Sequence, residues 1–266
     1  METMTLLSLS ALIALLPAAI LPYRGGGGRD AMFWMLLLVS IAGPLVLVIV
    51  AFAPGWRTGL APALWVTVAA TIGIYALVAA FAREGWRLAA LLYPYLFILG
   101  LIATIWQGQT GRAMADHAPT QWIYWHIAFS LATYAVLTLA AVAGVCAFLQ
   151  ERALKAKKET IMTRTLPSLS SAEGLELTLL GLTAIILLLG LLTGMAVQYF
   201  ESGVLLIVNH KTLFSLATLA IVVILLVARR TSGLRGRKAA RLVLLAYLLL
   251  TIAYPGVKFV TDVLIA

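Results

Sequence analysis

The chain has 266 residues, of which 63% are hydrophobic and 11% charged, and its formal net charge is +9. This composition excludes a soluble globular domain and indicates an integral membrane protein. Its one cysteine, Cys146, excludes a disulfide or a thiolate metal cluster within the chain.

Eight apolar segments follow one another along the chain, each long enough to cross a hydrocarbon core as a helix. Helices are expected because lipid offers the backbone no hydrogen-bond partners and these runs lack the alternation of barrel strands. The sequence therefore predicts an all-α polytopic membrane helix bundle, forming a single integral membrane domain over 1–266. The predicted spans are 5–22, 31–53, 60–82, 88–106, 121–149, 174–200, 207–228 and 239–265.

Local signals refine several of these helices. The first span follows Glu2 and precedes Arg24, the reverse of a secretory signal, so we expect it to be a retained helix. Ser170 followed by Glu173 fits a capping box that starts the sixth helix. Prolines inside apolar spans predict kinks. These prolines stand in the pairs Gly43-Pro44, Tyr93-Pro94 and Tyr254-Pro255.

The basic residues gather in alternate loops, and this predicts the orientation of the bundle. Fifteen of the 19 lysines and arginines lie within 24–29, 83–87, 152–164 and 229–241. By the positive-inside rule these loops are cytoplasmic, which makes both termini external. Topology and contact with anionic lipid head groups then account for the positive charge, so we expect the lipid bilayer and not nucleic acid as a partner.

The three histidines are the candidate metal ligands. His117 and His126 lie before or at the start of the fifth span, and His210 lies at the start of the seventh. On the predicted topology all three are external, with His126 and His210 at similar depth. Two neutral imidazoles in an apolar cleft can supply both axial ligands of a non-covalent, b-type haem. The alternative is an interfacial position in an aromatic belt, without any ligand.

Side chains at helical spacing extend this candidate site. Residues four apart share one face of a helix, and polar ones are expected to point into the bundle because lipid contact is costly. In the seventh span, Phe214 follows His210 by four residues and predicts an apolar wall below it. The stripe predicted on the fifth helix consists of Trp122, His126, Ser130 and Tyr134.

Lys258 is the candidate cation near the outer end of the last helix. It lies four residues before Asp262 and four after Tyr254, so a local ion pair is one interpretation. A second is that Lys258 meets the carboxylate of an anionic ligand such as a haem propionate. A third is that its ammonium group extends to the interface without a partner.

Five segments occur in order in the second half of the chain: "HIAFSLATY", "LPSLSSAE", "LLTGMAV", "NHKTLFSLATLAIVVILL" and "GLRGRKAARLVLLAYLLLTIAYPGVKFV". Through them the half over 121–266 resembles the cytochrome c assembly membrane proteins of the CcsA/CcmC type, especially their smaller YpjD/HemX-like branch. The first four helices, within 1–120, match only in hydropathy. The resemblance implies haem handling at the external face of a bacterial inner membrane, with membrane protein partners in cytochrome c assembly.

The resemblance also implies roles for two histidines. His126 falls where larger members carry an external haem-ligating histidine, and His210 aligns with the end of their tryptophan-rich haem-binding stretch. Here that stretch reads "VQYFESGVLLIVNHK", without tryptophan, so a His126/His210 pair is the expected substitute. We therefore expect a haem-binding assembly factor or carrier, not an enzyme. The alternative is a non-catalytic accessory or regulatory subunit, possibly transport-related, that does not bind haem.

Overall fold

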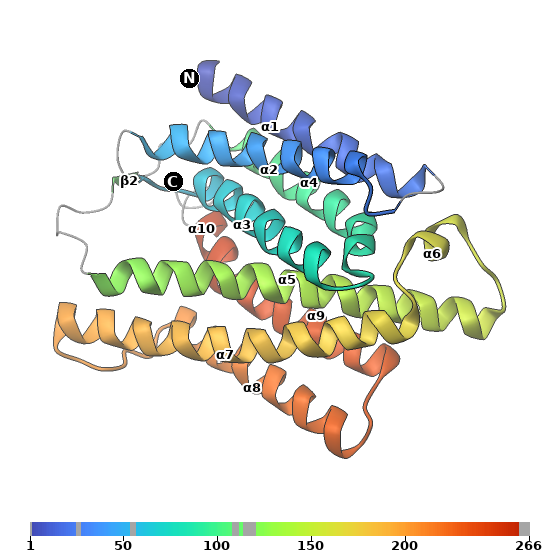
Figure 1. Ribbon diagram of the computed structural model, residues 1–266. Coiled ribbons are helices and arrows are strands. Elements are labelled where there is room, and N and C mark those ends of the chain that lie inside the picture. Colours follow the sequence, from blue (N-terminus) through green and yellow to red (C-terminus); the bar gives the residue numbers. More distant parts are fainter. Residues whose placement is uncertain (1, 25–27, 54–56, 108–111, 114–120, 261–266) are drawn as a thin grey trace.

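The computed structural model describes residues 2–24, 28–53, 57–107, 112–113 and 121–260. Within this part of the chain, eight helices are long and apolar enough to cross a membrane, and Figure 1 shows them side by side. The predicted all-α bundle of about eight spans is therefore confirmed. The long helices are α1 (Glu2–Ile20), α2 (Ala31–Phe52), α3 (Leu60–Phe81), α4 (Ala89–Ile105), α5 (Gln121–Ala156), α7 (Leu169–Ser202), α8 (His210–Thr231) and α9 (Gly236–Thr251).

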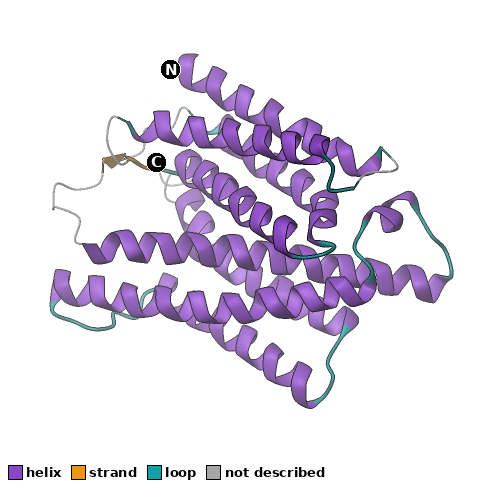
Figure 2. Cartoon of the chain, in the orientation of Figure 1, coloured by secondary structure: helices purple, strands orange, loops and turns teal. Residues whose placement is uncertain are grey.

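Short elements complete the described part of the chain, most of which is helical (Figure 2). Strands β1 (Arg57–Thr58) and β2 (Arg112–Ala113) pair antiparallel and join the α2–α3 loop to the α4–α5 loop. The remaining short elements are 3-10 turns at Leu21–Tyr23 and Gly85–Leu88, α6 (Ile161–Thr165), a π-helical turn at Ile252–Gly256 and α10 (Val257–Phe259).

Helix α5 is the centre of the bundle. Helices α1 to α4 pack on one another, α7, α8 and α9 form a second group, and α5 contacts both through α3, α7 and α9. Its buried stretch contains the small residues Ala135, Ala140, Ala143, Gly144 and Ala147. Small side chains let neighbouring backbones approach closely, which is how helices pack in lipid without a hydrophobic driving force.

Two helices are longer than the spans that hydropathy predicted. Helix α5 has 36 residues against the predicted 121–149, and α7 has 34 against the predicted 174–200. A 36-residue helix is about 54 Å long, whereas a hydrocarbon core is about 30 Å thick. Both helices therefore continue beyond the apolar stretch, and hydropathy detects only the part that matches lipid.

The capping box predicted at Ser170 and Glu173 is wrong. Helix α7 begins at Leu169, so Ser170 lies inside it, and the N-cap residue Ser168 makes no side-chain cap hydrogen bond. Instead the backbone N–H of Ser168 donates to the Glu84 carboxylate at 2.7 Å. A carboxylate from the α3–α4 loop thus replaces the local cap, which sequence spacing cannot reveal.

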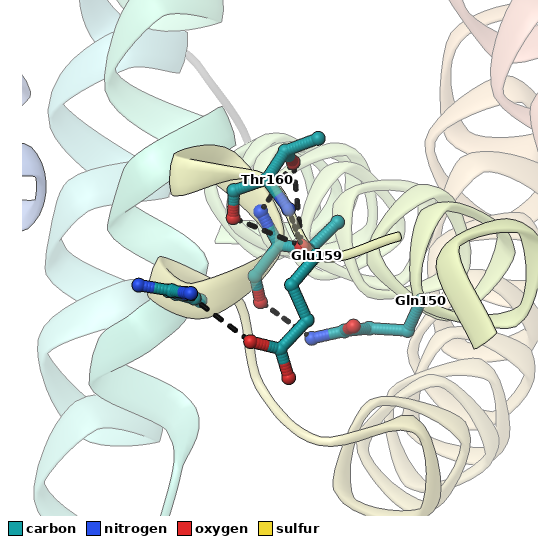
Figure 3. A network of polar contacts seen from close by, with 5 residues as sticks. Gln150, Glu159 and Thr160 are labelled. Atoms are coloured by element: carbon teal, nitrogen blue, oxygen red, sulfur yellow. Dashed lines mark hydrogen bonds and ion pairs between the residues drawn. The ribbon is translucent and has the colours of Figure 1, made fainter. Parts of the chain in front are cut away.

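A capping box does form in the α5–α7 loop, at the start of α6. Thr160 and Thr163 exchange hydrogen bonds between side chain and backbone. The Gln150 amide of α5 donates to the Thr163 carbonyl at 2.8 Å, and the neighbouring Glu159 pairs with Arg164 at 3.2 Å (Figure 3). The loop is therefore folded back onto α5.

The structure collects the four basic loops at one end of the bundle, where α1, α3, α5 and α8 end (Figure 1). Loop side chains tie this end together: Arg29 donates to the Ala79 and Ala80 carbonyls at 3.0 Å each, and Arg87 donates to the Leu166 carbonyl at 3.2 Å. The predicted alternation of the spans is confirmed. The cytoplasmic assignment of this basic end stays a prediction.

The prolines are accommodated in two ways. Helices α2 and α4 continue through Pro44 and Pro94. Pro255 lies in the π-helical turn that follows α9. A π-helical turn widens the backbone spacing, so a ring that would clash in a regular helix fits there.

Candidate functional site

His126 lies in the second turn of α5, and its ring rests on α7. Its Nδ1 atom is 3.0 Å from the carbonyl oxygen of Gly190. A carbonyl only accepts hydrogen bonds, so Nδ1 carries the proton and donates. In the neutral ring Nε2 is then the unprotonated nitrogen, the form in which imidazole binds a metal ion.

Glycine on α7 makes room for this ring. A Cβ atom at Gly194 would lie 2.9 Å from Cε1 and 3.1 Å from Nδ1 of His126. Gly190 and Gly194 are four residues apart and face α5, as small residues do where membrane helices pack closely. The segment "LLTGMAV" contains Gly194, and the absence of a side chain at this glycine leaves the space that the His126 imidazole occupies. This space is called the seat of the imidazole.

Aromatic side chains surround this end of α5. Trp122 stacks on Phe200 of α7 with ring centroids 6.4 Å apart, and Trp125 stacks on Phe129 at 6.0 Å. Trp122 is 43% exposed and Trp125 is 53% exposed. The arrangement supplies apolar walls for a flat ligand, and it is also typical of the aromatic belt at a membrane surface.

The predicted stripe on α5 does not face the bundle along its whole length. Tyr134 is buried, His126 is half-buried, and Ser130 and Trp122 are exposed. The expectation that Ser130 points inward is wrong. Neighbouring helices cover α5 on all sides only from Thr133 onward. The same face of the helix is therefore buried at Tyr134 and exposed nearer the start of the helix.

His210 is the first residue of α8 and is exposed, while Asn209 caps the helix by accepting from the Thr212 N–H at 2.9 Å. Phe214 is half-buried one turn further on. Lys211 lies within electrostatic range of the His126 ring. Among the described residues, no hydrogen bond joins the two imidazoles, and α8 packs mainly on α7 and α9.

The remaining predicted residues fall partly outside the described structure. His117 and Asp262 lie outside the described residues, and so does the side chain of Lys258, whose backbone belongs to α10. Tyr254 is 46% exposed. Across the described ranges, no group of three or more His, Cys, Asp or Glu side chains is placed to hold a metal ion.

A cluster of phenols in the bundle interior was missed at the sequence level. Tyr134 of α5 meets Tyr247 of α9 at 2.8 Å and Tyr95 of α4 at 3.4 Å between hydroxyl oxygens, and Tyr95 also contacts Tyr247. Thr251 lies 3.2 Å from Tyr134. A hydroxyl inside an apolar span needs a hydrogen-bond partner, so the tyrosines within predicted helices could have indicated a buried polar cluster. Only the packing shows that three of them meet.

Comparison with known proteins shows the family to which this chain belongs. A family model described as "Cytochrome C assembly protein" matches residues 31–265, which includes α2 to α4 as well as the half that carries the quoted segments. The chain is also 51% identical over 263 residues to a protein of Azospirillum brasilense, described as "Uncharacterized 28.8 kDa protein in nifR3-like 5'region", with 97% of each chain covered. This chain is a multi-pass membrane protein that belongs to the cytochrome c assembly protein family.

Proposed function

We propose that this protein binds haem near the external end of α5 and acts as a haem-handling factor in cytochrome c assembly. The observation that carries the proposal is the hydrogen bond from His126 Nδ1 to the Gly190 carbonyl, which leaves Nε2 of the neutral ring free to bind iron. The residues fit the group: the ligand is oriented by a backbone carbonyl, seated on Gly194 and flanked by stacked aromatic rings.

The other members of the proposed site have supporting roles. Haem would supply an iron that binds nitrogen ligands. His126 and His210, the latter at the start of α8, would hold this iron, and Trp122 and Phe214 would form apolar walls. Ser130 and Tyr134 follow His126 on α5 at intervals of four residues and would complete the site on this helix. Lys258 is assigned to a haem propionate.

The loop between α7 and α8 supports an apolar ligand at this end of the bundle. Five consecutive apolar side chains, from Val204 to Val208, are exposed there. The loop is held by the Gln198 side chain, which accepts from the Ile207 N–H at 2.9 Å. Such a surface is suited to a porphyrin edge or to the lipid interface.

The proposed role requires no chemical turnover by the chain. We place the protein in a bacterial inner membrane, in the smaller YpjD/HemX-like branch, with both termini and His126 on the external side. It would hold haem for membrane partners of the assembly process, and we propose non-covalent, b-type binding because the chain has a single cysteine, Cys146, and so no thioether attachment motif.

A visible spectrum of the purified protein with added haem tests the proposal. We expect a six-coordinate, low-spin spectrum that is lost in His126→Ala and in His210→Ala. His117→Ala is the matched control and should keep it. A spectrum that survives His126→Ala contradicts the assigned ligand. No haem uptake by the wild type overturns the proposal and favours an accessory subunit.

Cysteine labelling tests the proposed orientation. The native Cys146 is buried and should not react in folded protein. Arg57→Cys should react with an impermeant thiol reagent added outside the cell, whereas Arg235→Cys should react only after permeabilisation. The reverse pattern would place His126 on the cytoplasmic side.

A further inference from the structure

A surface groove lies between the last turns of α5 and the start of α9, at the basic end of the bundle, whereas His126 lies near the start of α5. Its volume is about 940 Å³, including space open to the surroundings. The residues lining it are Phe148, Glu151, Arg152, Lys155, Ala156 and Arg237. It shares no residue with the proposed haem site, so it needs its own explanation.

The charges around the groove do not balance. Lys155 pairs with Glu151 one turn earlier on α5. Arg152 and Arg237 are exposed, and neither forms an ion pair within the described part of the chain. Two guanidinium groups from different helices are thus available to one ligand, and paired guanidinium groups are well suited to phosphate.

The fold brings these two guanidinium groups together through a glycine turn. Gly233 and Gly236 have φ of +63° and +64°, a left-handed conformation that only glycine adopts readily. A Cβ atom at Gly236 would also meet the Glu151 carboxylate, so glycine suits the first residue of α9 both in conformation and in space. Arg237 follows directly and is thereby placed against α5.

The groove also has an apolar floor. Phe148, Arg152 and Lys155 are spaced by four and three residues, so they lie on one face of α5. Phe148 is nearer the apolar middle of the helix, and the cations are nearer its end. A ligand whose phosphate lies at the cations would therefore place its next groups against Phe148. A phospholipid has this order of groups, with the phosphate followed by apolar chains.

We infer that this groove is a binding site for the phosphate head group of an anionic phospholipid, held by Arg152 and Arg237 with its chains along Phe148. Basic pockets between membrane helices near the cytoplasmic surface bind such head groups. Free phosphate shares the head-group chemistry, but it would make no use of the apolar floor.

Binding of spin-labelled lipid to the full-length protein in detergent tests this site. Wild type should bind phosphatidylglycerol more tightly than phosphatidylcholine. Arg152→Gln with Arg237→Gln should weaken phosphatidylglycerol binding roughly tenfold, because both head-group contacts are lost. The control pair Lys158→Gln with Arg230→Gln removes the same charge from exposed positions outside the groove and should change binding less than about twofold.

Two further arms complete the experiment. Glu151→Gln removes the one acidic group of the groove and should tighten phosphatidylglycerol binding, a gain that a misfolded variant would not show. Inorganic phosphate in excess over the lipid should fail to displace it. Equal losses in the two double variants, no preference for phosphatidylglycerol, or displacement by inorganic phosphate would each overturn the lipid site.

Discussion

Glu176 of α7 and Arg229 of α8 form an ion pair whose side chains are only 1% and 7% exposed. Arg229 also donates to the Glu173 carbonyl at 3.1 Å. Glu176 rests on Gly144 of α5, where an added Cβ would lie 3.1 Å from its Oε1 atom. The pair therefore joins α8 to α7 where α7 packs on the central helix, nearer the basic end of the bundle than His126.

Breaking this pair should destabilise the protein strongly. Glu176→Ala should lower the free energy of unfolding by about 3 to 5 kcal/mol, because it leaves the Arg229 charge buried without its partner. The double variant Glu176→Leu with Arg229→Leu should lose less than the sum of the two single leucine variants. Thermal unfolding in detergent can be followed with a thiol-reactive dye, since Cys146 is buried until the bundle opens. Additive losses would contradict the coupling.

Adding a methyl group at Gly194 should disturb the seat of His126. Gly194→Ala forces the imidazole away and breaks its bond to the Gly190 carbonyl, at a cost of about 1 to 3 kcal/mol in stability. Gly181→Ala on the same helix is the matched control, because nothing lies within 4 Å of its added Cβ. On the proposed function, only Gly194→Ala also weakens haem uptake. Equal unfolding temperatures for the two variants would contradict this packing.

The phenol cluster should contribute to stability through its shared hydrogen bonds. Tyr247→Phe leaves the hydroxyls of Tyr95 and Tyr134 without their common partner, which costs about 1 to 3 kcal/mol. Tyr124→Phe removes an exposed hydroxyl and should leave the unfolding temperature unchanged. The same dye assay at Cys146 reports both. A neutral Tyr247→Phe would show that the hydroxyls re-pair elsewhere.

The contact between Glu84 and Ser168 should make stability depend on pH. Burial alone would raise the pKa of the Glu84 carboxyl, but hydrogen bonds from Ser168 and the charge of Arg87 outweigh it and hold the pKa below its ordinary 4.5. The folded state thus favours the ionised form. Its contribution is complete above the ordinary pKa and is lost as pH falls through the lowered one.

Glu84→Gln isolates this contribution, because glutamine keeps an acceptor for the Ser168 N–H but no charge. The difference in unfolding temperature between wild type and Glu84→Gln should be constant near neutral pH and shrink below about pH 4.5. Fluorescence of the seven tryptophans reports unfolding across this range, where thiol dyes react poorly. Parallel pH profiles would remove Glu84 as the cause.

Several features of this protein follow from the sequence alone. Hydropathy located all eight spans, because a helix in lipid needs about 20 apolar residues in a row and almost nothing else produces that pattern. The alternation of arginine-rich and arginine-poor loops predicted which loops share an end of the bundle. Neither requires knowledge of which helices touch, so both were accessible without coordinates.

Tertiary structure decided what the side chains do. Spacing alone placed Ser130 on the same inward face of α5 as His126. In the structure this face is buried only from Thr133 onward, so Ser130 is exposed. The seat on Gly194, the meeting of Tyr134 with Tyr247 and the cap supplied by Glu84 all join residues more than 60 positions apart. Any sufficiently apolar helix is stable in lipid, so hydropathy does not tell which helices are neighbours. The packing of small residues on α5 and α7 determines which polar groups come into contact.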